Sequence, residues 1–298
     1  MSYHNPVMLQ ECLDGLKIDP AGIYVDVTFG GGGHSRAIVD QLSQEGSLYS
    51  FDQDTDALAN SFEDERFTLV NHNFRFLKRF LTYHQAIPAD GILADLGVSS
   101  HQFDTADRGF SIRFDADLDM RMDQSHDLTA RDVLNNYEEK ELAKIFKEYG
   151  EIRSSKKLAN DVVRARSIKP IERVNELLEI LSSYVKPGKE HKFHAMVFQA
   201  LRIEVNDELG VLREMLAQTV DCLKVGGRLV VMSYHSLEDR LVKELIRNTV
   251  IKNESNPFEN DQLRWKVVNR KPIMASEGEI KENTRARSAK LRILEKVI

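Results

Sequence analysis

The chain has 298 residues, of which 42% are hydrophobic and 30% are charged, and its formal net charge is −6. This size suits one large domain or two ordinary ones, and the acidic balance does not by itself indicate a nucleic-acid-binding protein. The two cysteines, Cys12 and Cys222, lie far apart, which argues against structural zinc or a disulfide framework and for a reducing compartment.

The N-terminal residues 1–6 contain neither a basic start nor an apolar stretch, so we expect no signal peptide. No run approaches the ~20 apolar residues that cross a bilayer, so we expect no membrane partner. A cytoplasmic protein is therefore predicted, while its oligomeric state stays open.

Short apolar runs predict five strands, and helical patterns lie between the first three. This alternation is typical of a parallel, doubly wound α/β sheet. Two later segments, 263–269 and 289–296, are expected to close the sheet as an antiparallel pair at its edge. The five predicted strands are 23–27, 47–52, 66–71, 90–95 and 228–233.

From about 127 to 187 one helical pattern follows another, with Pro170 and the Pro187-Gly188 pair between them. We expect four helices here with a small core of their own. The predicted organisation is an α/β domain formed by residues 1–104 and 191–298, interrupted by an all-helical domain at residues 105–190.

Two helices are predicted after the insert, a long amphipathic one over 195–222 and a second over 236–248. Residues 252–262 and 274–286 are rich in Asn, Glu, Ser and Lys, and this composition predicts low order.

A run of glycines follows the first predicted strand. Residues 26–34 read Asp-Val-Thr-Phe-Gly-Gly-Gly-Gly-His, and residues 35–39 read as the start of a helix. Glycines let the backbone turn sharply and let a ligand approach the main chain. The pattern is typical of a nucleotide-cofactor loop, although a dinucleotide loop, a nucleoside loop and a plain tight turn would all fit it.

Three predicted strands carry an aspartate at or next to their last residue, namely Asp26, Asp52 and Asp95. Asp52 lies 20 residues after Gly32, the spacing at which an acid reaches a ribose hydroxyl pair. Three carboxylates at one edge of a sheet are unfavourable unless a cation joins them. These charges favour S-adenosylmethionine, which carries a sulfonium and an ammonium, over NAD, whose pyrophosphate would be repelled.

Polar residues also gather in the segments 95–104 and 233–240. Ser236 with Glu238-Asp239 fits a helix N-cap with acids in the first turn, which leaves His235 and Arg240 without a structural explanation. Three aromatic residues near these segments are candidates for holding a base or for core packing, namely Phe103, Phe110 and Tyr234.

Two local basic faces stand out on the acidic chain. Residues 152–169 carry a net charge of +5 and residues 281–298 a net charge of +4, which fits contact with phosphates or an ordinary solvated helix face. His191 and His194 stand three apart on a predicted helix without a third ligand nearby, so we expect no metal site.

Segments along nearly the whole chain resemble, in order, the bacterial small-subunit ribosomal RNA methyltransferase H family, also called MraW. The segments are His4 to Val7, Asp26 to Ser35, Asp95 to Ser100, Arg108 to Ser111, Leu118 to Asp123, Phe198 to Asn206, His235 to Arg240 and Arg285 to Arg292. The resemblance implies a class I, Rossmann-like, S-adenosylmethionine-dependent methyltransferase sheet with a helical insert. It also implies methylation of the exocyclic N4 of a decoding-centre cytidine in 16S ribosomal RNA, with the assembled small subunit as the expected partner.

Carried over by position, the family's cofactor contacts fall on eight residues. They are Gly31, Gly32, Gly33 and His34 in the glycine turn, Asp52 at the ribose, Phe74 near the adenine, and Asp95 and Gln102 completing the pocket. The sequence departs from the family at His101, where proline is usual, and over residues 193–197, where a His-Pro-Ala-Thr-Arg stretch is common.

Methyl transfer to a cytosine amino group needs an acceptor for the amino hydrogen, because the nitrogen lone pair is delocalised into the ring. Our candidates are Asp95 or a carbonyl near Gly97, with Ser99 and His235 as orienting partners. Three alternatives stay open: a small-molecule or protein methyltransferase with the same cofactor, a non-catalytic RNA-binding assembly factor, and an NAD enzyme.

Overall fold

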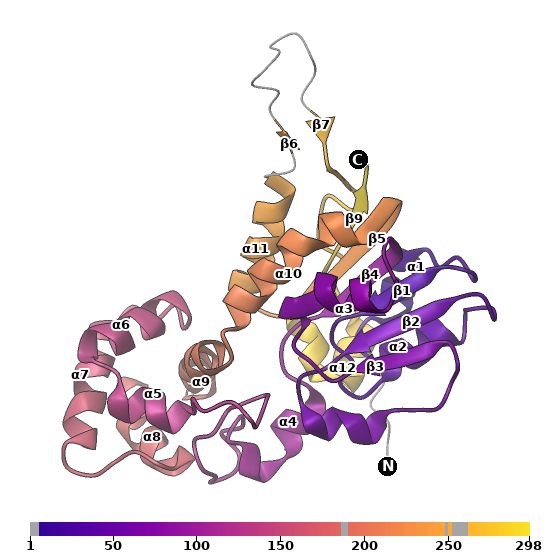
Figure 1. The fold of residues 1–298 in the computed structure, drawn as a ribbon. Helices are drawn as coiled ribbons and strands as arrows, with labels where there is room; N and C mark the ends of the chain where they lie inside the picture. Colours follow the sequence, from indigo (N-terminus) through magenta and orange to yellow (C-terminus); the bar gives the residue numbers. More distant parts are fainter. Residues whose placement is uncertain (1–5, 186–189, 248–249, 252–261) are drawn as a thin grey trace. The chain divides into compact units, whose positions relative to one another are not determined.

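The computed structural model describes residues 6–185, 190–247, 250–251 and 262–298 (Figure 1). It divides into two compact units, Met1–Gly97 with Leu209–Ile298 and Val98–Glu208. His4 and Asn5 of the first family-like segment lie outside the described residues. The Pro187-Gly188 pair and the 252–261 part of a predicted low-order stretch lie outside them too.

The first unit is built on a seven-stranded sheet with the strand order β3-β2-β1-β4-β5-β9-β8 (Figure 1). The first five strands in that order run parallel, whereas β9 is antiparallel to both of its neighbours. The strands are β1 Ile23–Asp26, β2 Ser47–Phe51, β3 Phe67–Val70, β4 Ala89–Asp95, β5 Leu223–Ser233, β8 Trp265–Val267 and β9 Lys290–Lys296. The predicted α/β class, the parallel strands and the closing antiparallel pair are confirmed.

Apolar side chains alternate between the two faces of this sheet, as the pleat requires. Val25, Ile92 and Leu229 belong to the core on one face, and their chain neighbours Tyr24, Leu93 and Val230 belong to the core on the other. The first face is covered by α3 Leu77–Tyr83, α10 Glu208–Cys222 and α11 Ser236–Arg247. The second face is covered by α1 Leu9–Leu16, α2 Gly33–Val39 and η5 Thr284–Ser288.

Shorter elements complete the first unit. They are the 3-10 helices η1 Thr55–Asn60 and η2 Phe74–Phe76, the helix α12 Glu277–Glu282, and a two-stranded sheet of β6 Val250–Ile251 and β7 Gln262–Leu263. Among the described residues, no helix is both long and apolar enough to cross a membrane.

The second unit is helical and has its own core. Its elements are α4 Ser100–Asp104, η3 Ala106–Arg108, α5 Ala130–Asn136, α6 Glu139–Glu148, α7 Ser155–Arg166, α8 Val174–Leu181, η4 Ser182–Tyr184 and α9 Glu190–Asn206. Leu134, Phe146, Leu158, Leu177 and Leu201, from five different helices, are all completely buried in that core. The four predicted helices between 127 and 187 are therefore present, and α9 joins them.

The irregular segment between η3 and α5 is fixed onto the C-terminal end of α9. Asn206 Oδ1 accepts from the Met122 N–H at 2.7 Å, and Asn206 Nδ2 donates to the Met120 carbonyl at 2.8 Å. Arg108, which is 7% exposed, donates from Nη2 to the Arg121 and Met122 carbonyls. These bonds explain why a sequence of alternating charged and apolar residues folds into an ordered loop without helix or strand.

Two boundaries differ from the sequence expectations. The compact helical unit spans 98–208 rather than 105–190, because the apolar face of α9 packs into its core. The predicted single helix over 195–222 is wrong, since α9 and α10 are separate helices. The break falls at Asp207, whose φ of +47° is left-handed, a conformation that aspartate adopts more readily than most residues.

The prediction of low order over 274–286 is also wrong. Ser276 caps α12 by accepting from the Glu279 N–H, and Asn283 caps η5 by accepting from the Arg285 N–H. The same serine and asparagine that suggested low order by composition are helix caps here.

Candidate functional site

Three aspartates lie at one edge of the sheet in the first unit. Asp26 is the last residue of β1, Asp95 is the last residue of β4, and Asp52 directly follows β2. These strands are adjacent and parallel in the order β2-β1-β4, and Asp26 pairs in register with Ser50 and Leu93. We call Asp26, Asp52 and Asp95 the acidic edge, and their gathering at one edge agrees with the sequence expectation.

The carboxylate of Asp26 is fully engaged inside the protein. Asp26 is completely buried, its Oδ1 accepts from the Thr28 N–H at 3.0 Å, and its Oδ2 accepts from the Ser35 hydroxyl at 2.7 Å. Thr28 Oγ1 in turn accepts from the Asp95 N–H at 2.7 Å. Asp26 therefore joins the start of α2 to the end of β4, through Thr28, and is a structural member of the acidic edge.

The glycine turn connects β1 to α2. Gly32 has a φ of +75°, a left-handed conformation that favours glycine. A Cβ added at Gly33 would lie 2.4 Å from Pro6 Cγ, so a side chain there would displace the N-terminal segment. A Cβ added at Gly31 would meet nothing within 4 Å, so the main chain at Gly31 borders open space.

Asp52 braces the glycine turn from the neighbouring strand. Its Oδ2 accepts from the Gly30 N–H at 2.8 Å, and its Oδ1 accepts from the Asp54 N–H at 2.9 Å. Burial raises the pKa of Asp52 to about 6, against the effect of these two hydrogen bonds. Asp54 caps η1 by accepting from the Asp56 N–H.

Asp95 has two side-chain neighbours. The Tyr234 hydroxyl donates to Asp95 Oδ1 at 2.8 Å, and Asp95 Oδ2 lies 3.7 Å from Nδ1 of His34. Burial raises the pKa of Asp95 to about 6, although His34 and the Tyr234 hydrogen bond oppose the rise. The Asp95 side chain is still 23% exposed, so solvent or a ligand reaches a carboxyl group that gains or loses its proton near neutral pH.

The ring of His34 is turned into the protein. Its side chain is 7% exposed, and Nε2 lies 3.1 Å from the Val7 carbonyl oxygen. Because a carbonyl oxygen can only accept, Nε2 carries the hydrogen and Nδ1 faces Asp95. His34 thus links the N-terminal segment to the acidic edge.

Tyr234 and Glu238 are site residues that the sequence did not single out in these roles. Burial and the nearby Asp95 raise the pKa of Tyr234 above its usual range, so its hydroxyl stays protonated and donates. Glu238 is 3% exposed, lies 3.1 Å from Nε2 of His235 through Oε1, and accepts from the backbone N–H of Tyr234 through Oε2. A tyrosine inside a protein usually pairs its hydroxyl, and this tendency was the one sequence-level indication that Tyr234 would have a polar partner.

The capping interpretation of Asp239 is incomplete. Its Oδ1 lies 2.6 Å from Arg292 Nε on β9, and the two side chains are 4% and 8% exposed. Lys243 also pairs with Asp239, at 2.6 Å. This buried ion pair attaches α11 to the sheet.

Ser99 and Gln102 lie in the second unit. The Ser99 hydroxyl accepts from the Gln102 N–H at 3.2 Å, and Gln102 Oε1 accepts from the Ser99 N–H at 3.1 Å. Together they form a capping box at the start of α4. Phe74, in the first unit, begins η2 and lies half-buried against the core on the α3 face of the sheet.

The basic faces are partly used inside the protein. In the C-terminal face, Arg292 pairs with Asp239 and Lys296 donates to the Leu223 carbonyl. In the 152–169 face, Arg166 donates to the Leu134 carbonyl and Lys169 pairs with Glu176. In the 152–169 face, three exposed cations form no ion pair within the part of the chain that the structure describes. They are Arg153, Lys156 and Arg164.

Comparisons with known proteins place the chain in a family. The MraW methylase family matches residues 1–297. A protein named Ribosomal RNA small subunit methyltransferase H from Flavobacterium johnsoniae is 54% identical over 299 residues, covering 100% of this chain and 99% of that protein. A protein of the same name from Parabacteroides distasonis is 54% identical over 298 residues, covering 99% of this chain and 98% of that protein. The chain therefore belongs to the MraW methylase family.

Proposed function

We propose that this protein transfers the methyl group of S-adenosylmethionine to the exocyclic N4 of a cytidine in the decoding centre of 16S ribosomal RNA. Full-length relatives named ribosomal RNA small subunit methyltransferase H support the reaction class and the RNA substrate. The observation that carries the proposal is the acidic edge beside an open glycine turn.

The residues at this edge fit a cationic nucleoside cofactor. Asp52 and Asp95 have pKa values of about 6 because burial disfavours their charge, and a neighbouring cation would favour it. The open space beside Gly31 lets a ligand approach the main chain, which a Cβ would obstruct. A pyrophosphate would face the same two carboxylates, and for that reason the NAD alternative is disfavoured.

Each candidate residue then has a proposed role. The backbone of Gly31, Gly32, Gly33 and His34 borders the cofactor, since the His34 ring is already engaged with the Val7 carbonyl and faces Asp95. Asp52 accepts from the ribose hydroxyls, and Phe74 contacts the adenine. Gln102, in the second unit, is a cofactor contact that only the family resemblance implies.

Asp95 is the proposed acceptor for the amino hydrogen of the cytosine. S-adenosylmethionine supplies the electrophilic methyl group when it is bound. Ionised Asp95 withdraws the hydrogen, which localises the nitrogen lone pair, and then holds the proton on its carboxylate. The Tyr234 hydroxyl fixes the orientation of the Asp95 carboxylate by donating to Oδ1.

Two residues are proposed to orient the substrate. His235 is held by Glu238 at the end of β5, the strand that pairs with β4. Ser99 follows β4 in the chain, at the start of α4. We further propose that the substrate is the assembled small ribosomal subunit, which would place the enzyme in the bacterial cytoplasm.

The experiment that tests this function supplies methyl-labelled S-adenosylmethionine together with small subunits, or naked 16S RNA, from cells that lack the gene. Mass mapping of the RNA should find one new methyl group on N4 of a decoding-centre cytidine, and Asp95→Asn should abolish it. Labelling of another base atom, or no labelling of either RNA, would refute the proposal.

A further inference from the structure

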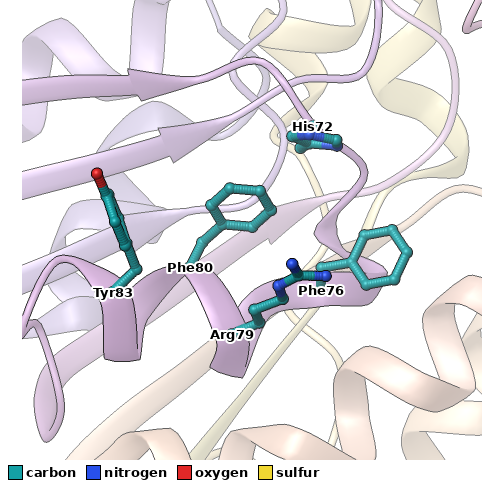
Figure 2. A pocket seen from close by; sticks show the side chains of 5 residues that line it. All are labelled: His72, Phe76, Arg79, Phe80 and Tyr83. Carbon is teal, nitrogen blue, oxygen red and sulfur yellow. The ribbon is translucent and has the colours of Figure 1, made fainter.

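A groove of about 500 Å³ lies on the first unit (Figure 2). Its described lining consists of His72, which follows β3, and four residues of η2 and α3, namely Phe76, Arg79, Phe80 and Tyr83. Two of its aromatic side chains are unusually accessible, since Phe76 is 41% exposed and Tyr83 is 79% exposed. Neither the acidic edge nor the core accounts for these exposed rings.

The floor of the groove is fixed by ring contacts. Phe80 packs edge-on against the buried Phe51, with ring centroids 6.1 Å apart, and its ring lies 4.8 Å from that of His72. His72 also meets Phe76 edge-on at 6.3 Å. The groove is therefore supported by the core of the sheet rather than by a loose surface segment.

The charge in the groove is positive and uncompensated. Arg75 and Lys78 on the same stretch pair with Glu214 and Asp221. The Arg79 side chain, in contrast, forms no ion pair or hydrogen bond with any residue that the structure describes. None of the five described lining residues is acidic. A partner that brings an anionic group is therefore complementary to Arg79.

The groove is tied to the end of β2 by two asparagines. Asn71 Nδ2 donates to the Asp52 carbonyl at 2.9 Å, and Asn73 Nδ2 donates to Gln53 Oε1 at 2.6 Å. His72 lies between these asparagines in the chain, so the lining of the groove begins next to Asp52 of the acidic edge.

We propose that this groove binds an unpaired nucleotide of the substrate RNA, with the base stacked on Phe76 or Tyr83 and the phosphate on Arg79. Proteins bind single-stranded RNA by stacking bases on aromatic side chains and pairing phosphates with arginine, and the groove offers both. The inference rests on the proposed function, because it assigns a second contact to the same RNA.

The test measures binding of the full chain to a fluorescent single-stranded RNA oligonucleotide with the decoding-centre sequence, by anisotropy at several salt concentrations. Phe76→Ala combined with Tyr83→Ala should weaken binding about tenfold or more, with an unchanged salt dependence, because stacking is not ionic. Arg79→Gln should weaken binding and lower the salt slope by about 0.7, the value for one phosphate contact on a single strand.

Lys78→Gln is the matched control, since it removes the same charge from the neighbouring residue and Lys78 does not line the groove. It should change the affinity less than twofold. Equal losses for Lys78→Gln and Arg79→Gln would overturn the inference, as would unchanged RNA affinity in the aromatic double variant. Self-association of the wild type that disappears in the double variant would instead assign the groove to a second copy of the chain.

Methyl transfer by the wild type is measured in parallel. RNA binding through the groove without any methylation would refute the proposed function and leave the groove assignment standing. Normal methylation together with unaltered RNA affinity in the groove variants would refute the groove assignment and leave the proposed function standing. Circular dichroism spectra and melting curves of every variant verify that it is folded.

Discussion

Tyr234 and His34 face different oxygens of Asp95, and only Tyr234 is hydrogen-bonded to its oxygen. The Tyr234 hydroxyl donates to Oδ1, whereas Nδ1 of His34 lies 3.7 Å from Oδ2, beyond hydrogen-bond distance. One oxygen is therefore anchored and the other is free of a strong bond. A carboxylate arranged in this way keeps its orientation and retains an oxygen that accepts from a substrate.

The affinity for S-adenosylmethionine should fall as the pH is lowered from 7 to 5. Asp52 and Asp95 have pKa values of about 6, so both take up protons across this range and lose their attraction for a sulfonium. Isothermal titration calorimetry across this pH range provides the measurement. S-adenosylhomocysteine, which lacks the sulfonium charge, is the matched ligand and should depend less on pH. Equal pH dependence of the two ligands would contradict the electrostatic role of the acidic edge.

Asp95→Asn should stabilise the unliganded protein at pH 7.5 while it abolishes methyl transfer. The raised pKa means that the carboxylate form costs folding energy above pH 6, and this cost disappears as the pH falls toward the unfolded value near 4. A shift of this size corresponds to about 1–3 kcal/mol in the free energy of unfolding, measured by urea denaturation.

The control for that prediction is Asp95→Ala. It also removes the charge, but it leaves the half-buried Tyr234 hydroxyl without its acceptor, so it should gain less stability than Asp95→Asn. If the stability difference between Asp95→Asn and the wild type did not shrink from pH 7.5 to pH 5, the assigned pKa direction would be wrong.

At the scale of elements, the turn between β1 and α2 has two kinds of glycine. Gly33 makes room for Pro6, whereas Gly31 borders open space. The first therefore serves the packing of the protein, and the second leaves room for a ligand.

Gly31→Ala should lower the affinity for S-adenosylmethionine at least tenfold and leave the melting temperature nearly unchanged. The added methyl group has space in the unliganded protein and would occupy the approach to the main chain. Gly33→Ala is the comparison, and it should lower the melting temperature because its Cβ would overlap Pro6. Calorimetry and thermal unfolding separate the two effects. Full cofactor affinity in Gly31→Ala would remove Gly31 from the proposed pocket.

The elements of the sheet were predictable because their signals are local. Three of the parallel strands are short apolar runs that end at or directly before Asp26, Asp52 and Asp95, and such runs specify both the strand and its end. The break between α9 and α10 was not predictable, since helical spacing continues on both sides of Asp207 and only its backbone angle separates the helices.

Side-chain partners between distant segments were the other unpredicted feature. Asp95 and Tyr234 are 139 residues apart in the chain, and Asp239 and Arg292 are 53 apart, so only the packed sheet brings them together. The capping box of Ser99 and Gln102 could be predicted from the three-residue spacing of the pair. The expected roles were instead substrate orientation for Ser99 and the cofactor pocket for Gln102.

At the scale of the whole molecule, an acidic chain must confine its RNA contacts to local basic surfaces. The net charge is −6, and Arg292 and Lys296 of the C-terminal basic face are used internally. The exposed cations Arg153, Lys156 and Arg164 beside and on α7 are thus the stronger candidates for phosphate contact.

Replacing Arg153, Lys156 and Arg164 together with glutamine should weaken binding to 16S RNA and lower the salt slope by about 2, because each phosphate contact contributes about 0.7 to 0.9. Filter binding at several salt concentrations gives the slope. The control replaces Lys140, Lys144 and Lys147 of α6, which stand among glutamates and are also exposed. Similar losses in both triple variants would show that total charge, rather than this face, determines the affinity.

The position of the helical unit between β4 and β5 also bears on how the protein is made. The half-sheet β3-β2-β1-β4 is complete once Asp95 has been synthesised, but the strand that covers β4 begins only at Leu223. A ribosome adding ~5–20 residues per second needs about 6 to 25 s for the intervening stretch. During that interval β4 is an edge strand with unpaired backbone N–H and C=O groups, and such an edge can pair with another chain. Synthesis of this protein should therefore depend on a factor that covers the exposed edge of β4 until β5 has been synthesised.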